Sequence, residues 1–298
     1  MAFTAPHVPH IFVFGLGYSA HALARHLRQS GTLISATCRT REKQRRLRDA
    51  GIDAHIFDRS NALDTDGRRA LEQATHLLSS VPPDEDGDPV IDLHGGDIRN
   101  AAPFDWIGYL STTGVYGNRD GATVDETADL TPSGSRGRRR LLAEQAWFSL
   151  GEAGPVQTFR LAGIYGPGRN ALETVRSGRA KRVVKPGQVF SRIHVDDIRQ
   201  ILLASMAKPE NGAAYNCCDD DPAPPQEVIA YACELMGVEP PPEIPFEEAE
   251  LSPMARSFYA DNKRVSNDRI KRELGVDLLW PSYRSALKTL HDLSDRAS

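Results

Sequence analysis

The sequence has little of what marks a membrane or a secreted protein. No apolar run approaches the roughly 18 residues needed to cross a bilayer, so we expect no membrane-spanning helix. The first ten residues lack a basic segment followed by an apolar one, which predicts no signal peptide. Only four cysteines are present, without paired metal-ligand spacing: Cys38, Cys217, Cys218 and Cys233. We therefore expect a cytoplasmic protein with buried thiols and no metal site.

An excess of positive charge is also lacking. The 36 Lys and Arg residues are outnumbered by 40 Asp and Glu, the net charge is −4 and the pI is about 6.2. This balance argues against a nucleic-acid-binding protein. The 298 residues, 40% of them hydrophobic, suffice for one large domain or two coupled ones.

The strongest motif is a change of hydrophobic period near the N-terminus. An apolar run from His10 to Phe14 reads as a buried strand, and helical spacing follows it through Leu27. The turn between them, Gly15-x-Gly17-x-x-Ala20, matches a dinucleotide-binding fingerprint with alanine as its third small residue. A glycine-rich turn without a ligand is the alternative. The predicted cofactor contacts are Gly15, Leu16, Gly17, Tyr18 and Ser19.

The end of the next predicted strand, Thr32–Cys38, indicates which dinucleotide binds. An acidic residue at this point would accept a hydrogen bond from the ribose 2′-OH, whereas arginine accommodates a 2′-phosphate. The chain has Arg39, Thr40 and Arg41 here and no carboxylate. We therefore predict NADP rather than NAD as the cofactor, with these three residues near the phosphate. A solvated basic helix start is the alternative, because Lys43, Arg45 and Arg46 follow.

Two further predicted strands end in candidate cofactor contacts. The strand Ala54–Asp58 ends in a carboxylate that could accept from the adenine amino group or cap the next helix. The strand Thr75–Ser79 continues into Ser80 and Val81, small residues suited to a backbone beside a pyrophosphate or ribose. The acidic loop that follows, residues 84–89, is expected to be merely solvated.

Strands that alternate with helices at this spacing predict an α/β fold, a Rossmann-like doubly wound parallel sheet. Its ligand crevice should lie at the carboxyl ends of the strands.

Several motifs along the chain share one resemblance. They are the Gly15–Ala20 turn, Ser111-Thr-Thr-Gly-Val-Tyr-Gly117, Val124-Asp-Glu-Thr127, Arg160-Leu-Ala-Gly-Ile-Tyr-Gly-Pro-Gly168, Arg192-Ile-His-Val-Asp-Asp197 and Leu274-Gly275. In this order they resemble the extended short-chain dehydrogenase/reductase family, which contains sugar-nucleotide epimerases and dehydratases. The resemblance implies a nucleotide-binding domain over residues 1–168 and about 190–220. A smaller interleaved substrate domain would take residues 169–189 and 221–298.

The resemblance also assigns catalytic positions, and here the chain departs from the family. Thr112 matches the family's catalytic Ser/Thr. Where the family has Tyr-x-x-x-Lys, this chain has Arg136 and Arg140. Arg140 could still donate to the nicotinamide ribose, as the family's lysine does. A guanidinium has a pKa above roughly 12, so Arg136 cannot move a proton as a phenol does.

Three other residues could supply the proton. Tyr116 belongs to a family segment in which it more often serves packing. Tyr165 follows the sixth strand, close to where the resemblance puts the nicotinamide, and is the favoured candidate. His194 lies in a segment that in the family ties the domains together.

The substrate is less well defined by the sequence. Family members that bind sugar nucleotides often have an arginine four residues before the histidine that corresponds to His194. This chain has Phe190 at that position. The predicted substrate contacts are Thr113, Arg169 and Arg192.

These patterns support three functional hypotheses. The first is an NADP-dependent oxidoreductase or epimerase/dehydratase-like enzyme that acts on a hydroxyl- or carbonyl-bearing metabolite, with a sugar nucleotide as one candidate. The second is a non-catalytic NADP-binding regulatory protein, which the loss of the tyrosine favours. The third, nucleic-acid binding through residues 136–140, conflicts with the acidic net charge. The predicted partners are thus a small-molecule substrate, with no nucleic acid and no membrane, and the predicted assembly is a monomer or homodimer.

Overall fold

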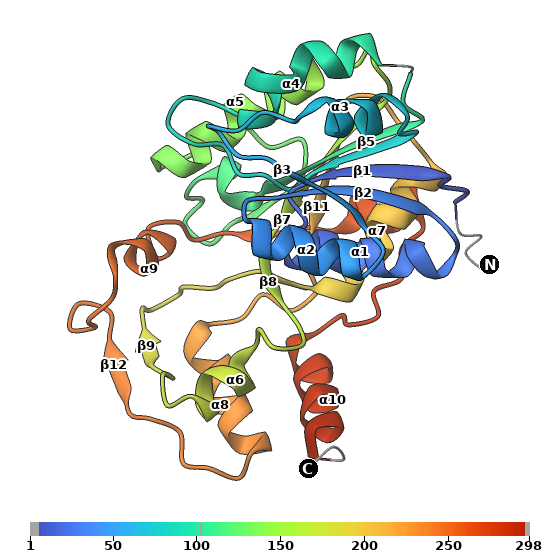
Figure 1. Cartoon of the computed structure of the whole chain (residues 1–298). Coiled ribbons are helices and arrows are strands. Elements are labelled where there is room, and N and C mark those ends of the chain that lie inside the picture. Colours follow the sequence, from blue (N-terminus) through green and yellow to red (C-terminus); the bar gives the residue numbers. More distant parts are fainter. Residues whose placement is uncertain (1–5, 102, 296–298) are drawn as a thin grey trace.

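The centre of the molecule is a seven-stranded sheet in which all neighbouring strands pair in parallel (Figure 1). The computed structural model describes residues 6–101 and 103–295. Across the sheet the strands are β11 (Ala213–Cys217), β7 (Val156–Leu161), β5 (Trp106–Thr112), β4 (His76–Ser79), β1 (His10–Phe14), β2 (Leu33–Cys38) and β3 (Asp53–Ile56). The predicted Rossmann-like α/β fold is confirmed.

Helices cover both faces of this sheet (Figure 1). One face is covered by α1 (Tyr18–Gln29), α2 (Arg41–Asp49) and α7 (Val195–Ala207), and the other by α3 (Thr65–Glu72), α4 (Pro89–Asn100) and α5 (Ser135–Phe148). Two separate hydrophobic clusters fill the two interfaces. Because both faces are buried, the strands are nearly continuous runs of buried residues rather than alternating ones.

The order of the strands places the ligand crevice. From β1 the chain winds outward through β2 and β3, then returns to β4 on the other side of β1 and continues through β5 and β7. The connection therefore reverses direction between β1 and β4. In such sheets, ligands bind beyond the carboxyl ends of the strands at this reversal. Gly15 and Ser80 flank it directly, since each follows one of the two strands.

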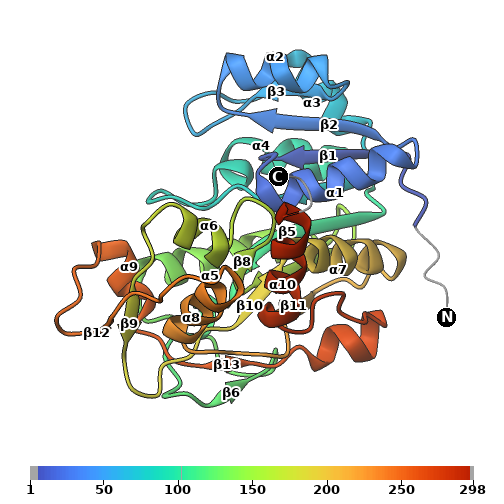
Figure 2. The same cartoon turned by 90° about the horizontal axis from the view of Figure 1, so that it is seen from below.

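Most of the remaining elements lie below the sheet in Figure 1, and Figure 2 shows them from below. Short parallel pairs join β8 (Gly163–Tyr165) to β10 (Arg192–His194), β9 (Arg182–Val184) to β12 (Glu243–Pro245), and β6 (Thr123–Val124) to β13 (Arg264–Val265). The helical segments among them are η1 (Thr113–Tyr116), α6 (Ala171–Arg176), α8 (Pro225–Leu235), α9 (Pro253–Phe258), η2 (Ile270–Leu274) and α10 (Tyr283–Asp295). The elements below the sheet in Figure 1 include α6, α8, β9, β12 and α10.

The division into a nucleotide domain and a substrate domain stays a prediction. Residues 1–5, 102 and 296–298 of the predicted domains, and half of the segment on which the signal-peptide prediction rests, lie outside the described residues. Within the described residues, no helix is long and apolar enough to cross a membrane. All four cysteines are free and buried, as predicted.

The prediction that the acidic loop is merely solvated was wrong. Arg59 binds Asp84 at 2.6 Å and Asp92 at 2.5 Å. Asp88 caps α4 through the N–H groups of Val90 and Ile91 and also accepts from the Trp147 indole at 3.0 Å. The loop is therefore tied to its neighbours, because its carboxylates find donors that are distant in the sequence.

Candidate nucleotide and catalytic site

The predicted glycine turn is anchored on both sides. Gly15 adopts φ +80° and its N–H donates to the Thr37 hydroxyl on β2 at 2.7 Å. On the other side the Ser80 hydroxyl donates to the Gly15 carbonyl oxygen. A Cβ at Gly15 would lie 3.1 Å from both Ser80 Oγ and Val81 Cγ2. The turn thus requires glycine for its conformation and for its close fit against the end of β4.

The start of α1 offers donors to an anion. Its N-cap is Gly17, which has no side chain to cap the helix, and the first turn contains no acidic residue. The His21 N–H makes the first helical bond, to the Gly17 carbonyl oxygen at 2.8 Å. The N–H groups that precede it have no intrahelical acceptor and carry the positive end of the helix dipole. This turn fits a dinucleotide diphosphate.

Positive charge gathers beside the turn at the end of β2. Arg39 and Arg41 are exposed, and within residues 6–101 and 103–295 neither forms an ion pair. Thr40 instead caps α2, accepting from the Lys43 N–H at 3.2 Å. The Lys43 ammonium donates to the Leu16 carbonyl oxygen at 2.6 Å, so a third cation lies directly on the glycine turn. Sequence reasoning counted Lys43 only as part of a basic helix start. Its position on the first turn of α2, directly after the end of β2, is the sequence feature that could have indicated a contact with the glycine turn.

The other predicted cofactor residues have mixed surroundings. The Asp58 carboxylate accepts from its own loop, from the Ser60 N–H at 2.8 Å and the Asn61 amide at 2.8 Å. These bonds, the Asn61 amide first, lower the pKa of Asp58. The next helix is capped by Asp64, so the capping role considered for Asp58 is wrong. Ser79 is fully buried, and its hydroxyl has no hydrogen-bond partner within the described part of the chain.

The predicted catalytic residues lie where β5 ends. The Thr112 hydroxyl accepts from the Gly114 N–H at 3.2 Å and so caps the short helix η1, which begins at Thr113. Helix α5 packs closely on this segment, because a Cβ at Gly137 would lie 2.7 Å from the Gly114 carbonyl oxygen. Arg140 on α5 donates to the Leu110 carbonyl oxygen on β5 and to the Tyr109 hydroxyl. Arg140 and Thr112 are therefore both held at the same end of β5.

Tyr116 belongs to a buried hydrogen-bonded network. Its hydroxyl donates to the Asn216 side chain at 2.8 Å and accepts from Arg160 at 2.9 Å. Arg160 also forms a buried ion pair with Glu144 at 2.9 Å. Burial raises the pKa of Tyr116 to about 12. This environment suits a structural residue better than a proton donor near neutral pH.

Tyr165 and His194 lie on a two-stranded sheet outside the central one. They are register partners on β8 and β10, and their rings pack edge to face with 5.3 Å between the ring centres. Tyr165 packs among residues of α6, α8 and α10, and burial raises its pKa well above the usual range. Burial lowers the pKa of His194 to about 4, and its Nδ1 accepts from the Asp196 N–H at 3.2 Å. Burial thus disfavours the charged form of both side chains.

The two predicted substrate arginines differ in their contacts. Arg192 donates to the carbonyl oxygens of Phe190 and Ala223 at 2.7 and 3.1 Å, and burial lowers its pKa. Its guanidinium is thus used inside the fold. Arg169 is exposed and stacks over the Tyr18 ring, 5.8 Å from its centre. The structure therefore brings Arg169 to the start of α1, beside the glycine turn.

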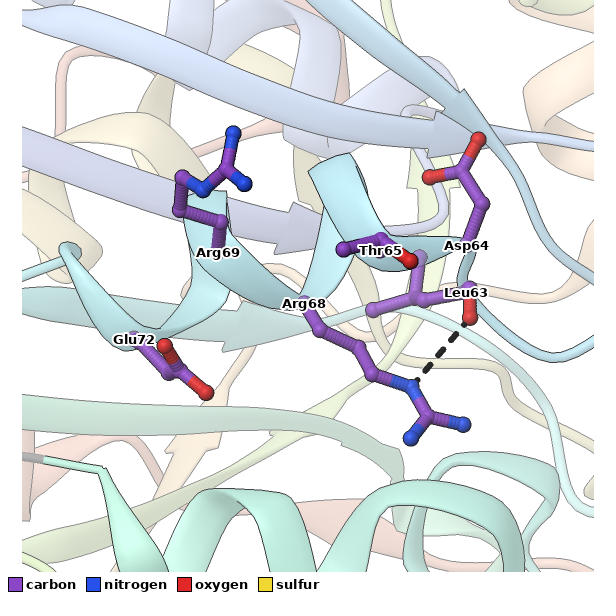
Figure 3. Close-up of a pocket in the computed structure, with 6 residues that line it drawn as sticks. All are labelled: Leu63, Asp64, Thr65, Arg68, Arg69 and Glu72. Atoms are coloured by element: carbon purple, nitrogen blue, oxygen red, sulfur yellow. Dashed lines mark hydrogen bonds between the residues drawn. The ribbon is translucent and has the colours of Figure 1, made fainter.

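A surface hollow of about 600 Å³ lies on α3, away from these residues (Figure 3). It is lined by Leu63, Asp64, Thr65, Arg68, Arg69 and Glu72, and Arg68 is turned back onto the Leu63 carbonyl oxygen. None of the predicted site residues lines it.

Comparisons with known proteins bear on both fold and family. The chain is 50% identical to a functionally unknown conserved protein from Silicibacter pomeroyi, over 96% of this chain and 99% of that chain, with a TM-score of 0.88. The chain belongs to the family of that protein. No protein-family model and no curated protein matches the sequence.

More distant solved structures share the fold. A UDP-glucose 4-epimerase from Thermotoga maritima, solved with UDP-glucose, is 15% identical over 97% of this chain and 99% of that chain, with a TM-score of 0.76. A dTDP-glucose 4,6-dehydratase from Bacillus anthracis, solved with NAD, is 14% identical over 96% of each chain, with a TM-score of 0.74. The fold is thus that of NAD-dependent epimerases and dehydratases.

Proposed function

We propose that this protein is an NADP-dependent oxidoreductase or epimerase/dehydratase-like enzyme of the extended short-chain dehydrogenase/reductase type. Its substrate would bear a hydroxyl or carbonyl group, and a sugar nucleotide is the class that the fold's relatives suggest. The observation that carries the proposal is the uncapped start of α1 beside three cations, Arg39, Arg41 and Lys43. Diphosphate and 2′-phosphate are the anions that such a pair of sites would suit.

When bound, the nicotinamide would supply or accept a hydride. The residues of this chain would bind the cofactor and orient it. The free N–H groups of α1 would bind the diphosphate, and Arg39, Arg41 and Lys43 the 2′-phosphate. The Thr112 hydroxyl would hydrogen-bond the reacting oxygen of the substrate. Arg140, which already holds the end of β5, retains further N–H groups for the nicotinamide ribose.

A second function is favoured by Arg136. It stands where the family has its catalytic tyrosine, on the first turn of α5, and a guanidinium cannot exchange a proton near neutrality. The surroundings of Tyr116, Tyr165 and His194 do not favour any of them as a replacement. A regulatory protein that senses NADP would need the nucleotide site and no proton donor.

One experiment separates the two functions. Binding of NADPH and NADH is measured by calorimetry, and a panel of carbonyl compounds and sugar nucleotides is then screened for a change in nicotinamide absorbance. The enzyme hypothesis expects tight NADPH binding and turnover of at least one substrate class. Tight binding without turnover on any panel would favour the regulatory protein. If neither NADPH nor NADH binds, both proposed functions are overturned.

A further inference from the structure

A four-residue turn, Gly166–Arg169, joins β8 to α6 and lies against the start of α1. The Tyr18 hydroxyl donates to the Pro167 carbonyl oxygen at 2.9 Å. The approach is close, because a Cβ at Gly166 would lie 2.7 Å from the Tyr18 hydroxyl and 2.8 Å from Val195 Cγ1. This turn follows β8, a short strand outside the central sheet, whereas Tyr18 directly follows the glycine turn of the proposed nucleotide site.

The backbone of the turn is held in one conformation. Gly166 and Arg169 exchange both backbone hydrogen bonds, at 2.9 and 3.0 Å. The Asn170 side chain donates to the Gly166 carbonyl oxygen and also caps α6 by accepting from the Glu173 N–H. Arg169 therefore projects from a fixed base rather than from a loose loop.

Among the described residues, Arg169 has no direct partner for its charge, since the neighbouring carboxylate near Tyr18, Asp196, pairs with Arg199 at 3.2 Å. Its guanidinium lies over the Tyr18 ring, and in the part of the chain that the structure describes it forms no ion pair and no side-chain hydrogen bond. The start of α1, which begins at Tyr18, is positive too, since its first N–H groups have no intrahelical acceptor and no acidic residue lies in the first turn. Two sources of positive charge thus meet at one place, and a diphosphate would satisfy both.

We propose that Arg169, supported by the Tyr18 ring, binds the diphosphate of the dinucleotide. This inference rests on the proposed function and differs from the sequence-based prediction, which assigned Arg169 to the substrate. The predicted domain division assigns Tyr18 to the nucleotide domain and Arg169 to the substrate domain, so the bound dinucleotide would also join the two predicted domains. Arg169 acts here as a binding residue and takes no part in proton transfer.

The test compares two ligands by calorimetry with Arg169→Gln. NADP⁺ carries the diphosphate, whereas adenosine 2′-phosphate lacks it and keeps the adenosine and the 2′-phosphate. We expect the substitution to weaken NADP⁺ binding about tenfold, the size of one charge-assisted contact. Adenosine 2′-phosphate should bind with unchanged affinity. Arg179→Gln removes another exposed arginine of the same predicted domain and should change neither affinity.

A second variant tests the support. Tyr18→Leu removes the ring under Arg169, so it should weaken NADP⁺ binding in the same way. Tyr18→Phe keeps the ring and removes only the bond to Pro167, so it should have a smaller effect. Both variants are checked for folding by thermal unfolding.

Several outcomes would overturn the inference. One is unchanged NADP⁺ binding with weaker binding of UDP-glucose as a substrate probe, which would return Arg169 to the substrate. Another is an equal loss for NADP⁺ and adenosine 2′-phosphate, because it would indicate a general disturbance of the site. If the unmodified protein binds neither nucleotide, the proposed function fails with it; in the other outcomes the nucleotide site stands and only the role of Arg169 falls.

Discussion

At the scale of single residues, what matters is whether each charge already has a partner. Arg160, Arg192 and Arg59 are arginines engaged by carboxylates or carbonyl oxygens of the fold. Arg39 and Arg169, in contrast, are exposed and without ion pairs among the described residues, and Arg169 lies beside the glycine turn. Residues of the first kind stabilise the structure, and those of the second kind are available to a ligand.

The choice between the two dinucleotides depends on Arg39. We expect Arg39→Asp to weaken NADPH binding by tenfold or more, because it replaces an attraction to the 2′-phosphate with a repulsion. NADH binding should fall far less. Calorimetry with both nucleotides measures the difference, and Arg45→Asp, an exposed charge reversal on the same α2 helix, is the matched control. Equal losses for the two nucleotides would remove Arg39 from the phosphate site.

Tyr165 remains the sequence's favoured proton donor, and the structure allows a sharp test. Its hydroxyl is buried and finds no hydrogen-bond partner within the described residues. We therefore expect Tyr165→Phe to keep both nucleotide binding and any NADPH-linked turnover, and to leave the protein at least as stable. Loss of turnover with intact nucleotide binding would instead establish Tyr165 as the donor.

At the scale of elements, the site depends on where β1 ends and α1 begins. The turn between them is bonded to β2 through Thr37 and to the end of β4 through Ser80. Its geometry is thus determined by three neighbouring strands together. A substitution in the turn should therefore lower ligand affinity more than it lowers the stability of the fold.

Gly15→Ala tests this dependence. At φ +80° an alanine is strained by about 1 kcal/mol or more, and its Cβ would press on Ser80 Oγ and Val81 Cγ2. We expect dinucleotide binding to weaken by more than tenfold. Gly31→Ala has nearly the same φ, +83°, but no atom within 4 Å of the added Cβ. It should therefore lose stability alone, as measured by denaturant unfolding, and bind nucleotide normally.

At the scale of the whole molecule, buried histidines make stability depend on pH. Burial lowers the pKa of both His76 and His194 to about 4, whereas an unfolded histidine titrates near 6.5. Between these values the unfolded chain binds protons that the folded chain does not. The stability that each neutral histidine contributes is therefore complete above pH 6.5 and is lost as the pH falls towards 4.

His76→Gln isolates one of these contributions. The wild-type protein should lose up to about 3 kcal/mol more than the variant between pH 6.5 and pH 4, because only the wild type carries this titration. The free energy of unfolding, measured by urea titration at several pH values, gives the difference. The difference in free energy of unfolding between wild type and variant could instead stay constant with pH. That result would show that His76 is protonated as easily in the folded state as in the unfolded one.

The sequence by itself determined the fold class and the position of the glycine turn. Both follow from local patterns, since buried strands, helical spacing and the Gly15–Ala20 turn each occupy one continuous stretch. The strand predicted from Thr32 to Cys38 is β2 (Leu33–Cys38), for the same reason.

The tertiary structure decided which charges are free and which are used. Asp84 lies 25 residues from Arg59, and Tyr18 lies 149 residues from Pro167. Such pairs leave no local pattern, because they are created when distant segments pack together. For this reason the acidic loop was mistaken for a solvated one, and Lys43 was interpreted only as part of a solvated helix start. The contact of Arg169 with the start of α1 became visible only in the folded molecule.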